Sequence, residues 1–247
     1  MADISAFPIT ARWPAKNPDI IQLYSFPTPN GVKASIVLEE LGLPYEAHPV
    51  DIMKNDSWTP EFLSLNPNGK IPAMIDPNGP DGKPLGLFES GAMLIYLADK
   101  TGRLVPADAG GRYETMQWVF FQMASIGPMF GQVGFFHKFA GREIEDKRPL
   151  NRYRDESKRL LGVMETRLEG RQWIMGDLYT IARHLDARLG AQPGRLLWGR
   201  GSGGIRQFPE CRGVAGARPG APRRSARPQH SSARLEHVSR KWAAVSG

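Results

Sequence analysis

The chain has a single cysteine, Cys211, among its 247 residues. One cysteine excludes a disulfide framework and a Cys-x-x-Cys redox pair, and such usage is typical of a reducing cytoplasm. Long apolar runs are also lacking. The first 18 residues contain three prolines and no continuous apolar segment, so we expect neither a signal peptide nor a membrane anchor. The composition predicts a cytoplasmic protein without a membrane partner.

An excess of basic residues is confined to the end of the chain. Residues 1–182 hold 19 basic and 22 acidic side chains, a net charge of −3, whereas residues 183–247 hold 13 and 3, a net charge of +10. This tail lacks the aromatic interleaving and the modules of nucleic-acid-binding arms, so a nucleic-acid partner is not expected. Its abundance of Arg, Gly, Pro, Ala and Ser, without a helical period, predicts a largely disordered segment.

The body of the chain is organised around residues 20–43, which read as a strand, a tight turn and a helix. The turn is Thr-Pro-Asn-Gly at positions 28–31, and Gly42 supplies a helix stop before a second strand at 44–50. The unit is therefore βαβ. Such a unit presents the first amides of its helix at the carboxyl end of a strand, where an anion or a thiolate is favoured.

Thr28 and Asn30 lie at that point of the βαβ unit. Two interpretations apply to them. Both residue types are preferred helix N-caps, so they can simply end the turn and begin the helix. Alternatively, their polar side chains face whatever ligand the helix N-terminus attracts.

Two later segments carry comparable signals. Asn-Pro-Asn-Gly-Lys-Ile-Pro-Ala at 66–73 places Pro72 inside an apolar run, which predicts either a bent edge strand or a cis-proline turn that exposes the backbone of Ile71. Glu89 and Ser90 then open a helix, where the hydroxyl and backbone amide of Ser90 suit a carboxylate and Glu89 suits an ammonium group.

In this order the segments resemble glutathione S-transferases, particularly the bacterial nu-class type with disulfide-reductase activity. The resemblance implies an α/β thioredoxin-like N-terminal domain followed by an all-α C-terminal domain. It also implies glutathione as co-substrate, no metal, a homodimer, and a small-molecule electrophile or disulfide as second substrate. No Tyr, Ser or Cys of the other transferase classes stands at the turn, so Thr28 and Asn30 would donate hydrogen bonds to the sulfur.

The same resemblance assigns the remaining site residues and the domains. The implied glutathione-binding residues are Lys70, Ile71, Pro72, Glu89, Ser90 and Arg152. For Arg152, an exposed cation at a helix start is the alternative. The expected domains are an arm at 1–19, the thioredoxin-like domain at 20–100, a linker at 101–110, a truncated all-α domain at 111–182 and the basic tail at 183–247.

The resemblance ends at Ala182, because the next residue in the family is an Asp that closes a capping box begun by Thr180. Here Arg183 follows, a cation at the positive end of a helix dipole. Codons that encode residues 183–190, read one base later, can give Asp-Ile-Ser-Met-Leu-Gly-Trp-Val, which restores the Asp and an apolar helix. We therefore expect the tail to be the product of a shifted reading frame.

Three functions remain open at this point. The first is a glutathione-dependent enzyme that activates the thiol, either for conjugation to an electrophilic carbon or for disulfide reduction. The second is a non-catalytic module of the same fold, or an inactive frameshifted product. The third, a basic nucleic-acid-binding protein, rests on residues 183–247 alone.

Overall fold

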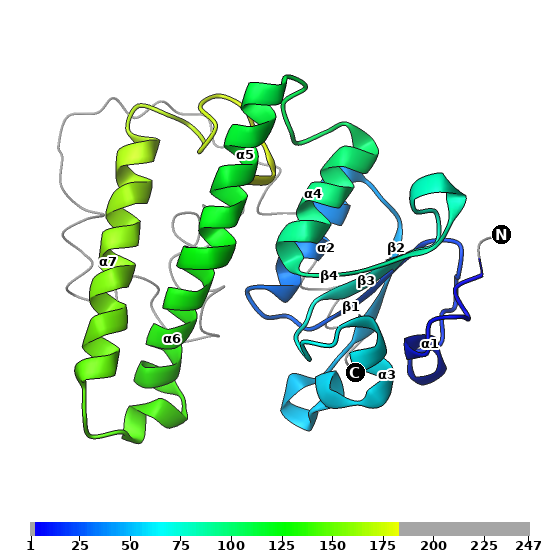
Figure 1. The fold of residues 1–247 in the computed structure, drawn as a ribbon, viewed down its shortest axis with the longest axis horizontal. Helices are drawn as coiled ribbons and strands as arrows, with labels where there is room; N and C mark the ends of the chain where they lie inside the picture. The colour runs from blue at the N-terminus through cyan, green and yellow to red at the C-terminus, as the bar shows by residue number, and fades with distance from the viewer. Residues whose placement is uncertain (1–2, 183–247) are drawn as a thin grey trace. The chain divides into compact units, whose positions relative to one another are not determined.

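The computed structural model describes residues 3–182 (Figure 1). The chain divides into two compact units, whose described parts are residues 3–101 and 102–182. The first unit is a mixed sheet with helices and the second is helical. The expected fold class, an α/β thioredoxin-like domain followed by an all-α domain, is confirmed. The predictions made for the tail at 183–247 lie outside the described residues.

A four-stranded sheet forms the centre of the first unit, with the strand order β2-β1-β3-β4. Strand β1 pairs with β2 in parallel, whereas the β1/β3 and β3/β4 pairs are antiparallel. The elements of this unit are α1 (Ile9–Arg12), β1 (Ile21–Ser25), α2 (Gly31–Leu41), β2 (Tyr45–Pro49), α3 (Pro60–Leu65), β3 (Ala73–Asp76), β4 (Leu85–Phe88) and α4 (Ser90–Thr101). The predicted βαβ unit is thus present, and its helix ends at Gly42 with a positive φ of 70°.

Helices cover both faces of this sheet. Helices α2 and α4 pack against each other on one face, while α1 and α3 lie together on the other (Figure 1). Because side chains alternate along a strand, Tyr24, Ala73 and Ile75 share the face toward α3, where they join a buried cluster with Phe62. The sheet is therefore buried on both sides, and the ends of its strands are the parts left to form a site.

The second unit consists of helices that follow one another with short breaks. They are α5 (Ala109–Phe121), a π-helical turn η4 (Gln122–Ile126), α6 (Gly127–Lys138) and α7 (Arg148–Leu168). The Gly127-Pro128 step lies within this run, and the chain stays helical there. The π-helical turn directly before Pro128 changes the hydrogen-bond pattern of the helix and so accommodates the missing N–H of the proline.

The stretch Ala109–Lys138 is 30 residues long, and by length and composition alone it is able to cross a membrane. A single such helix is weak support for a membrane protein, because core helices of globular proteins pass the same test.

Arg167 organises the interior of the second unit. Its Nη2 pairs with Glu114, its Nε donates to the carbonyl oxygen of Ile174 at 2.7 Å, and its guanidinium lies 5.1 Å from the ring centroid of Trp118. These contacts tie α5 and α7 to the segment after α7. Beside them, Ile126, Leu160 and Met164 belong to a buried apolar cluster.

A buried histidine makes the stability of the first unit sensitive to pH. His48 is 6% exposed, stacks on Tyr24 and shares a 2.8 Å hydrogen bond with Oε1 of Gln22. Burial lowers the pKa of His48, an effect that Lys16 adds to and Glu46 opposes. The unfolded chain therefore binds more protons than the folded chain just below the ordinary histidine pKa.

We predict that the free energy of unfolding falls as the pH drops from about 7.5 to 5.5, through the unfolded pKa of ~6.5. The variant His48→Gln should lose part of this slope, while His137→Gln, on the exposed part of α6, should keep it. Urea denaturation at several pH values measures the difference. Equal slopes in wild type and His48→Gln would contradict the prediction.

Candidate functional site

The register of the sheet brings the three predicted motifs to one edge, which is the edge where β1 and β4 end and β3 begins. Tyr24 of β1 is paired with Ala73 of β3, and Ala73 is paired with Phe88 of β4. The turn at 26–30 follows β1 directly, and Glu89 follows β4 directly. Pro72 immediately precedes Ala73 on the antiparallel β3, so all three segments leave the sheet at the same end.

Thr28 and Asn30 stand at the entrance of α2. The Oγ1 atom of Thr28 accepts a hydrogen bond from the Gly31 N–H at 3.2 Å, and its carbonyl oxygen accepts the Val32 N–H at 3.0 Å. Thr28 therefore does cap the helix. Asn30 occupies the N-cap position without capping the helix through its side chain, and its Oδ1 accepts from Nζ of Lys33 at 3.1 Å.

The turn at this entrance is very tight. A Cβ atom at Gly31 would lie 2.0 Å from the carbonyl oxygen of Phe26 and 2.5 Å from Oγ of Ser25. Glycine is required because any side chain would push the turn away from the helix start. The Thr28 and Asn30 positions depend on this close approach.

The Ile71-Pro72 peptide bond is cis, as the resemblance implies and against the alternative of a plain edge strand. Pro72 is buried, Ile71 is half-buried, and Lys70 is exposed. Nδ2 of Asn66 donates to the carbonyl oxygen of Lys70, which holds the turn before the proline. This arrangement leaves the Lys70 ammonium in solvent at the edge where the motifs meet.

Glu89 and Ser90 lie at the start of α4. The carbonyl oxygen of Glu89 accepts the Met93 N–H at 3.0 Å, so Glu89 is the residue from which the helix begins. Glu89 has a φ of 68°, a left-handed conformation that is uncommon outside glycine and that recurs at binding sites. Its side chain is exposed, whereas Ser90 is only 6% exposed.

Arg152 belongs to α7 of the second unit and is exposed there. The register argument concerns the first unit alone, so it places seven of the eight predicted site residues at one edge and leaves the role of Arg152 a prediction. The seven are Thr28, Asn30, Lys70, Ile71, Pro72, Glu89 and Ser90.

Hydroxyl groups just before the turn are unsuited to contact a ligand. Tyr24 and Ser25 are both 0% exposed. Burial, with a contribution from the charge of Glu46, raises the pKa of the Tyr24 phenol far above its usual range. Neither side chain reaches the surface, which leaves Thr28 as the hydroxyl at the turn.

Sequence reasoning missed two side chains at this edge. Lys33 is 3% exposed, and its ammonium group lies on Asn30, so a buried positive charge adjoins the helix start. Trp58 is 56% exposed, and its ring lies against Gly69, where a Cβ atom would be 3.0 Å from it. An apolar-facing lysine in a helix and a tryptophan in a loop carry no sequence signal that distinguishes them from ordinary packing residues.

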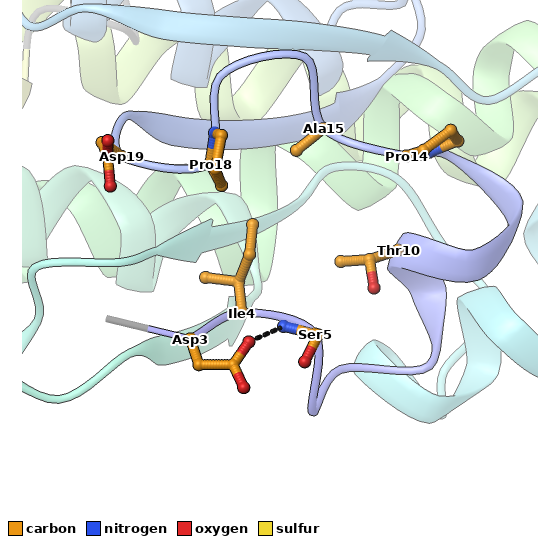
Figure 2. A pocket seen from close by; sticks show the side chains of 8 residues that line it. All are labelled: Asp3, Ile4, Ser5, Thr10, Pro14, Ala15, Pro18 and Asp19. Atoms are coloured by element: carbon orange, nitrogen blue, oxygen red, sulfur yellow. Dashed lines mark hydrogen bonds between the residues drawn. The ribbon is translucent and has the colours of Figure 1, made fainter. Parts of the chain in front are cut away.

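Other hollows of the chain lie apart from these residues. One of about 440 Å³ is lined by residues of the N-terminal arm (Figure 2) and another of about 480 Å³ by Trp118, Arg167 and their neighbours in the second unit. Among residues 3–182, no group of three or more His, Cys, Asp or Glu side chains is placed to hold a metal ion.

Comparison with known proteins decides the family. The model of the N-terminal domain of glutathione S-transferases matches residues 28–100. The disulfide-bond oxidoreductase YfcG of Escherichia coli K12 is 44% identical over 164 residues, which are 66% of this chain and 75% of YfcG. YghU of the same organism, also a disulfide-bond oxidoreductase, is 40% identical over 66% of this chain and 57% of its own length. The chain belongs to the glutathione S-transferase family.

Solved structures agree with this assignment. A glutathione transferase family member from Pseudomonas fluorescens, with two glutathione bound, is 66% identical to this chain over 73% of this chain and 79% of its own, with a TM-score of 0.72. A glutathione transferase from Burkholderia graminis, with two glutathione molecules per subunit, is 61% identical over 91% and 98%, with a TM-score of 0.75. The resemblance found in the three sequence motifs is confirmed.

Gly31 offers a direct test of the tight turn before α2. We predict that Gly31→Ala lowers the free energy of unfolding by about 2 kcal/mol or more, since the new methyl group must displace backbone atoms. Gly131→Ala, in the interior of α6 with open space around it, should be neutral or stabilising by about 0.5–1 kcal/mol. Thermal denaturation compares the two, and equal effects would show that the turn can yield.

Proposed function

We propose that this chain binds glutathione at the edge formed by the ends of β1 and β4 and the start of β3, and uses the activated thiol as a nucleophile. The observation that carries the proposal is the register that aligns Tyr24, Ala73 and Phe88 across the sheet. An extended tripeptide then meets one motif along each part of its length. Three ordered motifs at one edge are far more specific than any of them alone.

Each motif suits a different part of glutathione. The ammonium and carboxylate of the γ-glutamyl end match Glu89 and the start of α4 at Ser90, where an anion meets backbone amides. The peptide backbone in the middle matches Ile71, whose position before Pro72 leaves it half-buried at the site. The Lys70 ammonium supplies a positive charge for the remaining carboxylate.

Thr28 is suited to stabilise the glutathione thiolate. A hydroxyl has one donor hydrogen and two acceptor lone pairs, and the bond from the Gly31 N–H uses an acceptor position. The O–H hydrogen remains for a sulfur atom, and a hydroxyl that already accepts a hydrogen bond is a stronger donor. The capping and catalytic interpretations of Thr28 are therefore compatible.

Positive charge near the turn at 28–31 also favours the thiolate form of glutathione. A free thiol has a pKa of about 8.5, so the thiolate must be favoured at neutral pH, and nearby cations lower thiol pKa values. The buried Lys33 beside Asn30 and the N-terminus of α2 supply such a field. We propose that Arg152 of the second unit adds to the same site.

The relatives YfcG and YghU, both disulfide-bond oxidoreductases, favour disulfide reduction over conjugation as the main reaction. The thiolate attacks one sulfur of a disulfide, which forms a mixed disulfide and releases the other sulfur as a thiolate. The chain has one cysteine in total, so it cannot resolve that mixed disulfide with an internal pair. A second glutathione thiolate must do so, with glutathione disulfide as product, and the Pseudomonas and Burkholderia relatives each hold two glutathione molecules. Conjugation to an electrophilic carbon is the second candidate.

The organisation of the chain remains part of the proposal. We propose the arm at 1–19, the glutathione domain at 20–100, the linker at 101–110 and the truncated helical domain at 111–182. A cytoplasmic location fits the single cysteine. A homodimer fits the exposed Tyr113 and Phe120, which lie seven residues apart on α5.

The shifted reading frame is also a proposal. The Ala182 N–H donates to Oγ1 of Thr180 at 3.3 Å, which is the hydrogen bond of a helix start, and the basic tail begins at the next residue. The coding DNA decides the matter, because codons for 183–247 read one base later must give a family-like helix. If they do, this chain is a variant of low activity, and the non-catalytic module becomes the rival function.

Glutathione binding tests the proposed site. We expect Ser90→Ala and Glu89→Ala each to raise the dissociation constant by about 10- to 100-fold, because each removes a hydrogen bond to a charged group worth ~1.5–3 kcal/mol. Ser64→Ala, an exposed serine on α3, is the matched control and should bind normally. Isothermal titration with reduced and oxidised glutathione is the measurement, and unchanged binding in both site variants would refute the assignment.

The protonation state of the bound glutathione sulfur tests the proposed role of Thr28 and Asn30. In the double variant Thr28→Val and Asn30→Ala, we expect the pKa of the bound thiol to rise by about one unit or more, since two donors to the thiolate are lost. Glutathione affinity should change less than turnover, because the hydrogen bonds from Thr28 and Asn30 strengthen as negative charge develops on the sulfur. Thiolate absorbance against pH measures the shift, with Thr166→Val on the exposed part of α7 as control. An identical titration curve would leave Thr28 and Asn30 as structural residues only.

A further inference from the structure

The N-terminal arm, residues 3–19, is packed into the first unit beneath the proposed glutathione site. Ile4 and Ile9 are 4% and 0% exposed and belong to the same buried cluster as Tyr24 and Phe62. The Trp13 Nε1–H donates to the carbonyl oxygen of Pro49 at 3.1 Å. The arm is therefore part of the core of this unit.

The arm makes its first link to the site through apolar packing. Ile71, a proposed glutathione-binding residue, packs against the cluster that contains Ile4 and Ile9. Phe7 lies so close to β4 that a Cβ atom at Gly86 would be 2.8 Å from its ring. Gly86 is three residues before Glu89, so the arm packs against Ile71 of one motif and against the strand that leads to another.

A second link runs through an ion pair. Arg12, the last residue of α1, donates from Nη2 to Oδ1 of Asp56 at 2.8 Å. The other carboxylate oxygen, Oδ2, accepts the Asp51 N–H at 3.0 Å, and the carbonyl oxygen of Asp56 accepts from Oγ1 of Thr59 at 3.0 Å. Asp56 thus fixes the loop at 51–59, and Arg12 fixes Asp56.

This loop ends against the proposed site. It follows β2, whose last residue pairs with the last residue of β1, so the loop leaves the sheet at the same edge as the three motifs. Trp58 is carried by the loop, and its ring lies on Gly69 with Nζ of Lys70 at 6.0 Å from the ring centroid. A displacement of the loop would therefore move the Trp58 ring away from the turn that presents Lys70.

Figure 2 shows a hollow within the arm. Asp3, Ile4 and Ser5 line one side of it, and Pro14, Ala15, Pro18 and Asp19 line the other. The two limbs of the arm stand apart around this hollow of about 440 Å³, so they do not brace each other there. The arm is held by its contacts with the sheet and α3 and by Arg12.

We propose that the arm is a positioning element of the glutathione site, and that Arg12 is a positioning residue that acts through Asp56 and Trp58 on Lys70. This inference rests on the proposed function for its effect on ligand binding. Arg12 touches no ligand in this scheme. It restrains the loop whose tryptophan covers the Gly69 and Lys70 turn.

The Arg12–Asp56 ion pair is suited to hold the loop at 51–59 in place, and it contributes little to the free energy of unfolding. The side chains of Arg12 and Asp56 are 43% and 18% exposed, and exposed pairs of this kind stabilise a fold only slightly. Arg159 and Glu156 form a comparable pair on α7, 61% and 22% exposed and 2.7 Å apart. That pair is a matched control, since its loss removes the same charge and the same type of contact elsewhere.

The experiment compares Arg12→Ala with Arg159→Ala in the full chain. We expect Arg12→Ala to weaken glutathione binding about threefold to tenfold by isothermal titration, the range for a residue that acts through intermediates. Arg159→Ala should bind as wild type, and both variants should melt at similar temperatures. In a double-mutant cycle on the dissociation constant, Arg12→Ala and Asp56→Asn should be non-additive, because either change alone breaks the same ion pair. Equal affinity in Arg12→Ala and Arg159→Ala overturns the inference.

Hydrogen exchange provides a readout that needs no glutathione. The Gly69 N–H donates to the carbonyl oxygen of Asn66 at 3.0 Å, so its exchange reports the opening of the turn before Lys70. Arg12→Ala should speed exchange in residues 66–72, whereas Arg159→Ala should not. Unchanged protection of residues 66–72 in Arg12→Ala overturns the inference, whether or not the wild-type chain binds glutathione. Failure of the wild-type chain to bind glutathione refutes only the proposed function.

Discussion

The structure of the first unit depends on one register, that of β1, β3 and β4. Pairing of Tyr24 with Ala73 and of Ala73 with Phe88 brings three loops to one edge, although they are far apart along the chain. A shift of one residue in either pair would exchange the side chains between the two faces of the sheet. Each face packs against its own helices, so the packing of the core enforces the alignment. The candidate site is therefore a consequence of the core.

Close backbone approach at the edge follows from the same constraint. The turn after β1 must reverse direction within a few residues, which places the carbonyl oxygen of Phe26 where only glycine at position 31 is tolerated. This places Thr28 so that its hydroxyl accepts from the helix and retains a hydrogen to donate. In the same way, the left-handed backbone of Glu89 is held by the strand before it and the helix after it.

Residues outside the three motifs also hold the candidate site in place. The arm contributes buried side chains to the cluster under Ile71, and Arg12 restrains the loop of Trp58 through Asp56. The buried Lys33 adds positive charge beside Asn30. The helices of the second unit form a separate interior around Arg167, in which a charged side chain joins α5 and α7.

The sequence by itself determined the local elements and the identity of the motif residues. The strand at 21–25, the helix ended by Gly42 and the helix opened by Ser90 follow from periodicity, turn residues and caps, which act over a few residues. Only the tertiary structure decided that the motifs share an edge, that Lys33 and Trp58 adjoin them, and that Arg12 reaches Asp56. Those relations join residues such as Tyr24 and Ala73, which are 49 positions apart, and no local periodicity records a contact made across a sheet.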